Sequence, residues 1–303
     1  MKKINFIKIV KLFKMAFKKW WNRDPFNESA IIAYNAIFSL PGLLVVVITI
    51  AGYFLGNDAI SGKLHNEVEQ VMGTDTANQI QNIVMIANKS KDSVWATIMG
   101  VAIILVGATG VFVKLQNSFN TIWEFKTSKS KSGILSFLKS RLFSFGLIIS
   151  IAFLLLMSLV LSSLLSAFGT WVTNYWSESL LVVFKILNGI FSVIIITILF
   201  ALMFKFLPDA KIKWRSVWIG AFVTPLLFVL GKSALGLYFG KADPASGYGA
   251  AGSLVLILLW TSYTSMIVFY GAEFTKVYSD QYYGETAPSV NSVSLSNIES
   301  KTN

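Results

Sequence analysis

Residues 142–168 read LFSFGLIISIAFLLLMSLVLSSLLSAF and carry no charged side chain. At about 1.5 Å per residue, a helix of this length exceeds the ~30 Å hydrocarbon layer of a bilayer. Five other apolar runs complete the set, at about 30–56, 93–124, 179–206, 216–240 and 249–273. The fold class is therefore predicted to be an all-α membrane protein, a bundle of six transmembrane helices.

The composition of the 303-residue chain supports this prediction. The chain is 54% hydrophobic and only 14% charged, whereas a soluble domain carries roughly 25% charged residues. Of the 26 basic residues, eight precede Ala30, five lie within 126–141 and four within 205–215, each group beside an apolar run. This pattern follows the positive-inside rule and predicts cytoplasmic termini. A nucleic-acid partner is not expected, because no single basic face is indicated despite the net charge of +11.

The N-terminal segment at 1–23 is predicted to form a basic amphipathic helix on the cytoplasmic surface of an anionic leaflet. One face carries lysines and another carries apolar side chains. The lysines are Lys8, Lys11, Lys14 and Lys18, and the apolar residues are Phe6, Ile9, Phe13, Phe17 and Trp20. The alternative is a solvated charged run that only orients the protein. Asp24-Pro25 then supplies a helix N-cap followed by proline at the first helical position.

The transmembrane domain is predicted to cover residues 24–283. It includes an extracytoplasmic connector at 57–92, where five acids and three lysines accompany two stretches of helical periodicity. This connector is expected to form a hairpin of two short amphipathic helices on the outer surface of the bundle. The tail at 284–303 is rich in Ser, Asn and Thr and is predicted to be disordered in the cytoplasm.

The sequence offers little for catalysis. It has no cysteine and a single histidine, His65, in the acidic outer connector. A zinc site of the usual kinds or a Ser-His-Asp triad needs more than this, and scattered carboxylates do not suit metal-dependent phosphodiester cleavage. No catalytic residue, metal or cofactor is predicted, and the protein is not expected to be an enzyme.

Polar groups inside the apolar runs are the candidate site residues, because they are costly in a membrane. Lys185 and Lys232 lie about two turns from the outer ends of the fourth and fifth runs. One hypothesis is that the two lysines form a cationic pocket for an anionic group such as a lipid phosphate. The alternative is that both snorkel to the outer interface.

Other polar or small residues in the runs are expected to serve helix packing. Glu273 and Lys276, one turn apart at the cytoplasmic end of the last run, are expected to pair locally. Gly236 and Gly240 are expected to mark a close helix contact. Four asparagines are expected to hydrogen-bond between helices: Asn35, Asn117, Asn120 and Asn188.

Several segments, taken together, resemble a known family. They are Ser39-Leu40-Pro41, LQNSFNTIW at 115–123, LPDA at 207–210, YGAAGS at 248–253 and GAE at 271–273. In this order and spacing they resemble the YihY/BrkB family of bacterial inner-membrane proteins, also circulated under the name ribonuclease BN. The resemblance covers about residues 26–283. Two details depart from the family pattern, the spacing before Pro41 and the position of Tyr263.

The resemblance implies a six-helix envelope protein of the bacterial inner membrane that serves envelope maintenance or transports lipid-like or anionic material. Membrane lipids, including anionic ones, are the partners expected. A non-transporting membrane scaffold is the alternative, and a ribonuclease is a remote one, since the groups that would cleave a phosphodiester are missing. A polar cavity reaching the middle of the membrane would favour transport, and a bundle packed dry throughout would favour the scaffold.

Overall fold

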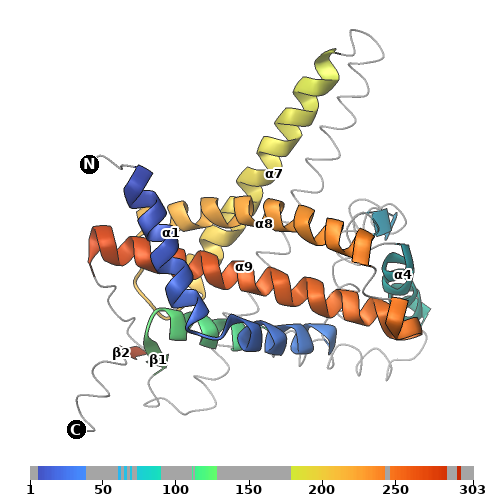
Figure 1. Cartoon of the computed structure of the whole chain (residues 1–303), viewed down its shortest axis with the longest axis horizontal. Coiled ribbons are helices and arrows are strands. Elements are labelled where there is room, and N and C mark those ends of the chain that lie inside the picture. The colour runs from blue at the N-terminus through green and yellow to red at the C-terminus, as the bar shows by residue number, and fades with distance from the viewer. Residues whose placement is uncertain are drawn as a thin grey trace.

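In the computed structural model, the described residues are mostly helical, and they include one short ribbon of two strands (Figure 1). The structure describes residues 6–38, 61–62, 65–66, 69, 74–89, 111, 113–127, 179–242, 246–284 and 292–294. The run at 142–168, most of those at 30–56 and 93–124, and the first half of the 57–92 hairpin lie outside these residues.

The labelled elements follow one another along the chain. They are α1 (Phe6–Trp21), α4 (Thr74–Lys89), β1 (Phe125–Thr127), α7 (Ser179–Phe206), α8 (Trp214–Ala242), the 3-10 helix η3 (Ser246–Ala251), α9 (Gly252–Tyr283) and β2 (Ser292–Ser294). Residues 25–38 and 113–122 are also helical. Three helices, α7, α8 and α9, are long and apolar enough to cross a membrane. They correspond to the fourth, fifth and sixth apolar runs of the sequence.

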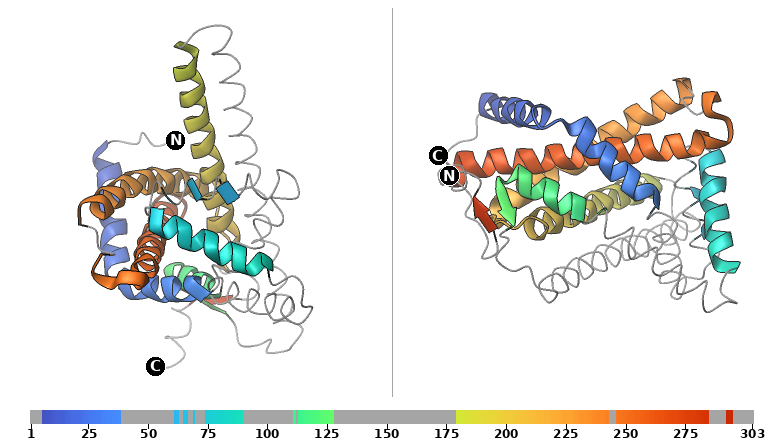
Figure 2. Two further views of the ribbon diagram at one scale, coloured as in Figure 1. Left: turned by 90° about the vertical axis from the view of Figure 1, so that its right-hand side faces the viewer. Right: turned by 90° about the horizontal axis from the view of Figure 1, so that it is seen from below.

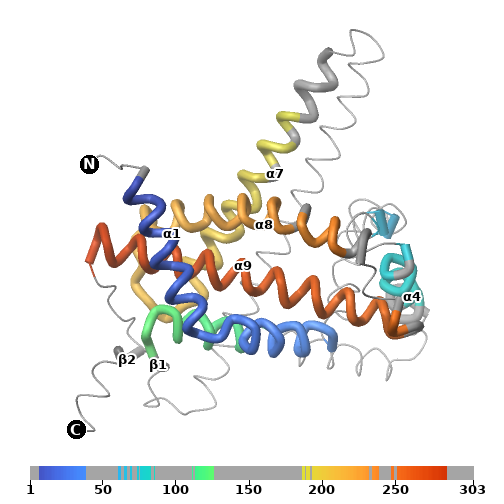
Figure 3. Tube along the Cα trace, viewed as in Figure 1, coloured from blue at the N-terminus to red at the C-terminus, as the bar shows by residue number. Residues whose placement is uncertain are grey.

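The antiparallel helices α8 and α9 run side by side (Figures 1 and 3) and approach closely through paired glycines and threonines. A Cβ placed on Gly220 would overlap the hydroxyl of Thr275, and one placed on Gly271 would overlap that of Thr224. Each threonine hydroxyl donates to the carbonyl four residues earlier in its own helix, at 2.8 Å for Thr224 and 2.7 Å for Thr275. A small residue therefore faces a threonine at both points, which lets the two backbones approach.

The glycine expected to mark such a contact does not mark one. Nothing lies within 4 Å of a Cβ built on Gly236, so among the described residues this glycine is not at a tight helix interface. Gly231 is at one instead, since a Cβ there would overlap the ring and hydroxyl of Tyr263. A small-xxx-small spacing alone does not reveal which side of the helix meets a neighbour.

A hydrophobic core joins the helices at one end of the bundle. Phe119 and Phe204 are fully buried, with ring centroids 5.8 Å apart, and Phe269 completes the group at 6.3 Å from Phe119. The helices at 25–38 and 113–122, the end of α7, the start of α8 and the second half of α9 all contribute to it. Three of the segments that carry the family resemblance thus meet here: 115–123, 207–210 and 271–273.

Helix α1 packs on α9 at this end and crosses it steeply (Figures 1 and 2). Leu12 and Ala16 are buried against Phe274, Val277 and Tyr278. The two helices are also tied by hydrogen bonds, from the Trp20 indole to the Met266 carbonyl at 3.1 Å and from the Tyr270 hydroxyl to the Phe13 carbonyl at 3.2 Å.

The expectation that Phe13 and Trp20 lie on the lipid-facing side of this helix is therefore wrong. Phe13 stacks on Tyr270 and lies against Phe274 with its ring tilted, and Trp20 meets Tyr270 edge to face. These large rings bury more apolar area against α9 than they would at a wet interface. The lysines Lys8, Lys11, Lys14 and Lys18 are exposed, as the sequence pattern requires.

At the opposite end, α4 lies across the start of α9 (Figure 2). Ala77 and Ile80 are buried, and the Ser253 hydroxyl bonds to the side-chain oxygen of Gln79. α4 begins at Thr74 and covers the second of the two periodic stretches of the 57–92 connector. Nearer the end that holds α1, α7 crosses α8, and the N-terminal part of α7 extends away from α8 and α9 (Figure 1).

Three residues of the tail at 284–303, Ser292–Ser294, form the strand β2, and the predicted disorder of the tail stays a prediction. β2 pairs antiparallel with β1, and Val293 lies opposite Lys126. Glu124, just before β1, has a positive φ of 60° and turns the chain out of the helix at 113–122. β1 therefore offers free backbone groups, which the tail satisfies. The rest of the tail lies outside the described residues.

The close contact of α8 and α9 predicts different outcomes for the same substitution at two glycines of α8. Gly220→Ala should destabilise the fold by about 2 kcal/mol, because its methyl group forces the helices apart. Gly236→Ala is the matched control and should be neutral or slightly stabilising, because alanine is the better helix former. Thermal unfolding of both variants in detergent measures the difference. Equal unfolding temperatures would contradict the close contact.

Candidate functional site

Charged side chains from four segments meet beside the C-terminal half of α9. We call this group the charged cluster: Arg23, Glu28, Lys114, Glu124, Glu273 and Lys276. Three are acidic and three are basic. At about 1.5 Å per residue, Glu273 lies about 32 Å along the helix from Gly252, near the depth at which a span beginning there leaves the hydrocarbon layer.

Arg23 is placed by a sharp corner in the chain. α1 ends at Trp21 and the next helix begins at Pro25, as the Asp24-Pro25 pair predicts. The Asp24 carboxylate accepts from the backbone N–H of Asn27 at 3.4 Å. The φ of Asp24 is +52°, a left-handed conformation that asparagine and aspartate tolerate better than most residues. The corner directs Arg23 towards α9.

The guanidinium of Arg23 pairs with the fully buried carboxylate of Glu273. It also donates to the carbonyls of Thr121 at 2.8 Å and Ile122 at 3.3 Å, and lies 3.6 Å from the carboxylate of Glu124. A buried carboxylate needs a charged or hydrogen-bonding partner, and Arg23 supplies one. From the sequence alone, Arg23 is only one of the positive charges that set orientation.

The predicted local pair of Glu273 and Lys276 is wrong. Lys276 pairs with Glu124, whereas Glu273 pairs with Arg23. Residues three apart on a helix point in different directions by about 60°, and here each meets an opposite charge from another segment. Burial alone would raise the pKa of Glu124, but the hydrogen bond and charge of Lys276, helped by Lys19 and Arg23, outweigh it and lower that pKa.

A second pair completes the cluster. The Lys114 ammonium lies 3.1 Å from Glu28, and the hydroxyl of Ser118 donates to the same carboxylate. Lys114 comes from the helix at 113–122, in the last third of the run at 93–124. Glu28 comes from the helix at 25–38, just before the run at 30–56. Opposite charges at the ends of different runs were the signal in the sequence that could have indicated this contact.

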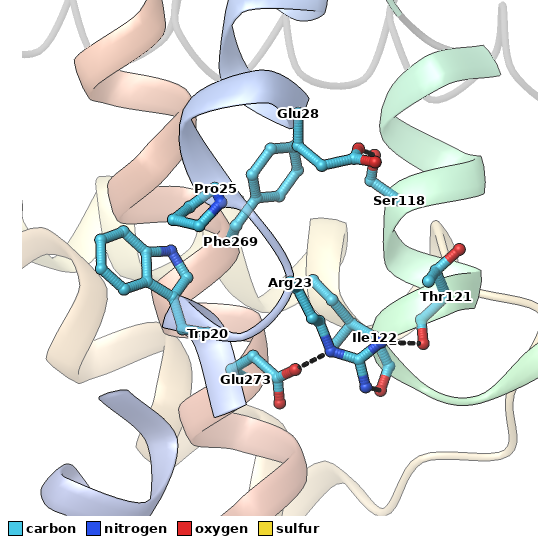
Figure 4. Close-up of a pocket in the computed structure, with 9 residues that line it drawn as sticks. All are labelled: Trp20, Arg23, Pro25, Glu28, Ser118, Thr121, Ile122, Phe269 and Glu273. Atoms are coloured by element: carbon cyan, nitrogen blue, oxygen red, sulfur yellow. Dashed lines mark hydrogen bonds and ion pairs between the residues drawn. The ribbon is translucent and has the colours of Figure 1, made fainter. Parts of the chain in front are cut away.

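Three members of the cluster, Arg23, Glu28 and Glu273, line a small cavity of about 40 Å³ (Figure 4). Its lining combines charged, hydroxyl and aromatic side chains, and the residues are Trp20, Arg23, Pro25, Glu28, Ser118, Thr121, Ile122, Phe269 and Glu273. One carboxylate oxygen of Glu273, Oε2, is buried and has no hydrogen-bond partner among the described residues. At about 10–15 Å³ for each, the cavity has room for about three or four water molecules. Water there would satisfy this oxygen.

A polar contact at the same end joins the connector between α7 and α8 to the helix at 113–122. The Asn120 amide donates to the Asp209 carboxylate at 2.9 Å, and its carbonyl accepts from the Asp209 backbone N–H at 2.7 Å. Asn120 is therefore the one predicted asparagine that bonds between segments among the described side chains. Asn35 donates to the Ile31 carbonyl of its own helix at 2.8 Å, and Asn117 is exposed.

The remaining predicted site residues are not brought together in the described structure. Lys185 lies in α7 and Lys232 in α8, but their side chains, like that of Asn188, lie outside the described residues. The pocket of two lysines stays a prediction. Of the polar residues that the sequence singled out, Glu273 and Lys276 belong to the charged cluster.

Comparison with known proteins gives a match to a family model described as virulence factor BrkB, over residues 16–294. The chain is 23% identical over 278 residues to a UPF0761 membrane protein of Saccharophagus degradans, covering 91% of this chain and 61% of the relative. It is 25% identical over 283 residues to one of Pseudoalteromonas atlantica, covering 91% and 88%. The UPF0761 membrane protein YihY of Escherichia coli is 27% identical over 208 residues, covering 66% and 64%. No solved structure matches the chain.

These matches confirm the family resemblance that the ordered motifs indicate. The chain spans less than two thirds of the length of the Saccharophagus and Escherichia relatives. All three relatives are named as membrane proteins, in agreement with the three span-length helices of the structure.

Removal of Arg23 should destabilise the fold strongly. Arg23→Ala leaves the Glu273 carboxylate buried without its partner, at a cost of about 3–5 kcal/mol. Replacing both groups, with Arg23→Met and Glu273→Leu, should recover most of that loss because no buried charge remains. Thermal unfolding in detergent compares the two variants. A single variant as stable as the unmodified protein would contradict the assigned pair.

The pair of Glu124 and Lys276 predicts a dependence of stability on pH. The pKa of Glu124 is lower in the folded protein than its usual value of 4.5, so its contribution is present above that value and is lost as pH falls through the folded pKa. Glu124→Gln should be less stable than the unmodified protein at pH 7, and the difference should shrink below about pH 4.5. Unfolding temperatures at several pH values measure it, and a constant difference would refute the assignment.

Proposed function

We propose that this chain, which belongs to the virulence factor BrkB family, is a six-span protein of the bacterial inner membrane with both termini in the cytoplasm. Three span-length helices and three further apolar runs support this count. The three described helices alone do not reach six, so the proposal relies on the runs at 30–56, 93–124 and 142–168.

The orientation rests on where basic residues gather in the fold. The lysines of α1 and the basic residues of 205–215 lie at the end of the bundle that holds the charged cluster. Lys205 donates to the Ile212 carbonyl and lies 5.5 Å from the ring centroid of Trp214, which fixes that connector at the same end. The positive-inside rule assigns this end to the cytoplasm, and α4 then lies on the outer side.

We propose further that the protein serves the cell envelope by transporting lipid-like or anionic material. The observation that carries this proposal is the charged cluster itself. Charged groups buried inside a membrane protein are expensive and indicate a functional site by default, and the Glu273 carboxylate is fully buried. The cluster ties α9 to Arg23 and to Glu124, and it ties Glu28 to Lys114. Separating these ion pairs would open the cytoplasmic end of the bundle.

In this mechanism the ion pairs act as a cytoplasmic gate. Lys185 and Lys232, nearer the outer ends of their helices, would meet the anionic group of the transported molecule. The cluster has three acids and three bases and so carries no net charge. The closed gate therefore does not attract an anion. An anion is therefore not held at the gate but passes it when the pairs separate.

A non-transporting scaffold is the second candidate. The small cavity favours it, because about 40 Å³ holds a few water molecules and not a lipid headgroup. In that case the charged cluster would only hold the helices together, and α1 and α4 would present surfaces to other envelope components. Ribonuclease activity remains a remote alternative, since the chain has one histidine and no cysteine.

A lipid-translocation assay tests the transport proposal. Purified protein is reconstituted in vesicles that contain phosphatidylglycerol labelled with a fluorophore in both leaflets, and dithionite is added outside. Transport should let dithionite quench inner-leaflet label that protein-free vesicles protect. Lys185→Glu with Lys232→Glu should slow this loss, because the reversed charges repel the phosphate.

The control is the same vesicle with labelled phosphatidylcholine, which has no net charge and should move less. Quenching equal to that of protein-free vesicles for both lipids would reject transport of lipid and favour the scaffold. Mass spectrometry of lipids retained by the gently purified protein gives an independent measure of which headgroup binds.

A further inference from the structure

One face of α1 is apolar and uncovered. Ile7, Val10, Phe17 and Trp21 are between 50% and 79% exposed, although the opposite face of the helix is buried on α9. Four large apolar side chains in one short helix are unlike the single exposed hydrophobic residues found on any protein surface. They form an apolar stripe that α9 does not cover.

The stripe continues into the next helix. The ring of Trp21 stacks on Phe17 at 5.9 Å and meets Phe26 edge to face at 5.8 Å. Beyond the corner at Asp24, Tyr34 and Phe38 are also exposed and lie 5.1 Å apart. An exposed apolar surface thus runs from α1 onto the start of the first apolar run. The medium that covers that run is the hydrocarbon layer, so the stripe on α1 adjoins it.

The angle between the two helices decides how α1 meets that layer. Figures 1 and 2 show the helix at 25–38 running along α9, whereas α1 crosses α9 steeply. If α9 crosses the bilayer, α1 lies along the membrane surface. An amphipathic helix in that orientation buries its apolar face at the boundary between headgroups and acyl chains, and tryptophan is enriched at that level.

The charges beside the stripe determine which lipid it meets. Lys11, Lys14 and Lys18 are exposed and lie on the side away from α9. At about 100° per residue, Lys14 falls inside the apolar stripe, and Lys18 and Lys11 lie at its edge. Lysines beside an apolar stripe attract acidic headgroups while their alkyl chains lie along the interface.

We propose that the stripe Ile7, Val10, Phe17 and Trp21, with Lys11, Lys14 and Lys18 beside it, docks α1 on a leaflet that contains anionic phospholipids. This face differs from the one that the sequence pattern indicated, because Phe13 and Trp20 are used against α9. The inference needs a membrane-crossing α9 but does not depend on transport.

The experiment uses the absence of cysteine from the chain. Single variants Phe17→Cys and Lys8→Cys of the full chain are labelled with an environment-sensitive fluorophore. Positions 8 and 17 lie on opposite sides of α1, at about 100° per residue. Both variants are reconstituted in vesicles of phosphatidylcholine alone or with phosphatidylglycerol, and quenching is measured with spin-labelled lipid and with aqueous iodide.

The label at position 17 should be quenched several-fold more by spin-labelled lipid than the label at position 8, and more so when phosphatidylglycerol is present. Replacing Lys11, Lys14 and Lys18 together by glutamine should remove the effect of phosphatidylglycerol while leaving the fold intact. Equal access of iodide to both positions would overturn the proposal. A second outcome would also overturn the proposal. If both iodide and spin-labelled lipid fail to reach position 17, and this shielding disappears when the protein is diluted in the vesicle, a second copy of the chain covers the stripe.

Discussion

The approach of α8 to α9 is the contact on which the described architecture depends. Two glycines, one on each helix, face threonines of the other helix, and the helices are antiparallel, so the same small-against-threonine contact occurs twice. In a bilayer the hydrophobic effect gives no preference for helix contact over lipid contact, and close van der Waals packing must provide it. α9 is thereby fixed in place, and it carries both the surface that α1 packs against and the carboxylate of Glu273.

The charged cluster is a consequence of that placement. Arg23 reaches Glu273 only because α1 lies on α9 and the chain turns sharply at Asp24. Ser118 and Lys114 reach Glu28 because the helix at 113–122 lies beside the one at 25–38. The polar groups therefore join segments that are separated in the sequence by about a hundred residues or more. Their cost in the membrane is offset by pairing, and this restricts the arrangement of the helices more tightly than apolar packing alone.

The sequence predicts the described helices well and their contacts poorly. Hydropathy placed α7 at the bounds the structure has, because a long apolar run carries its own length signal. Amphipathic spacing identified α1 as a helix but assigned Phe13 and Trp20 to lipid. These rings pack on α9 instead, since α9 and lipid are equally apolar partners for them. Nothing in the spacing of Gly236 distinguished it from Gly220. The partner of Glu273 was mistaken because the nearest opposite charge in sequence, Lys276, is not the nearest in space.

The threonines of the α8–α9 contact have a mechanical implication. Each hydroxyl already donates within its own helix, so the interface holds two helices together through these residues by shape and not by a shared proton. Drawing α8 away from α9 would strand no hydroxyl in hydrocarbon. At this seam the helices can slide or separate without breaking an interhelical hydrogen bond of these threonines, and the resistance to such motion comes from the close van der Waals contact.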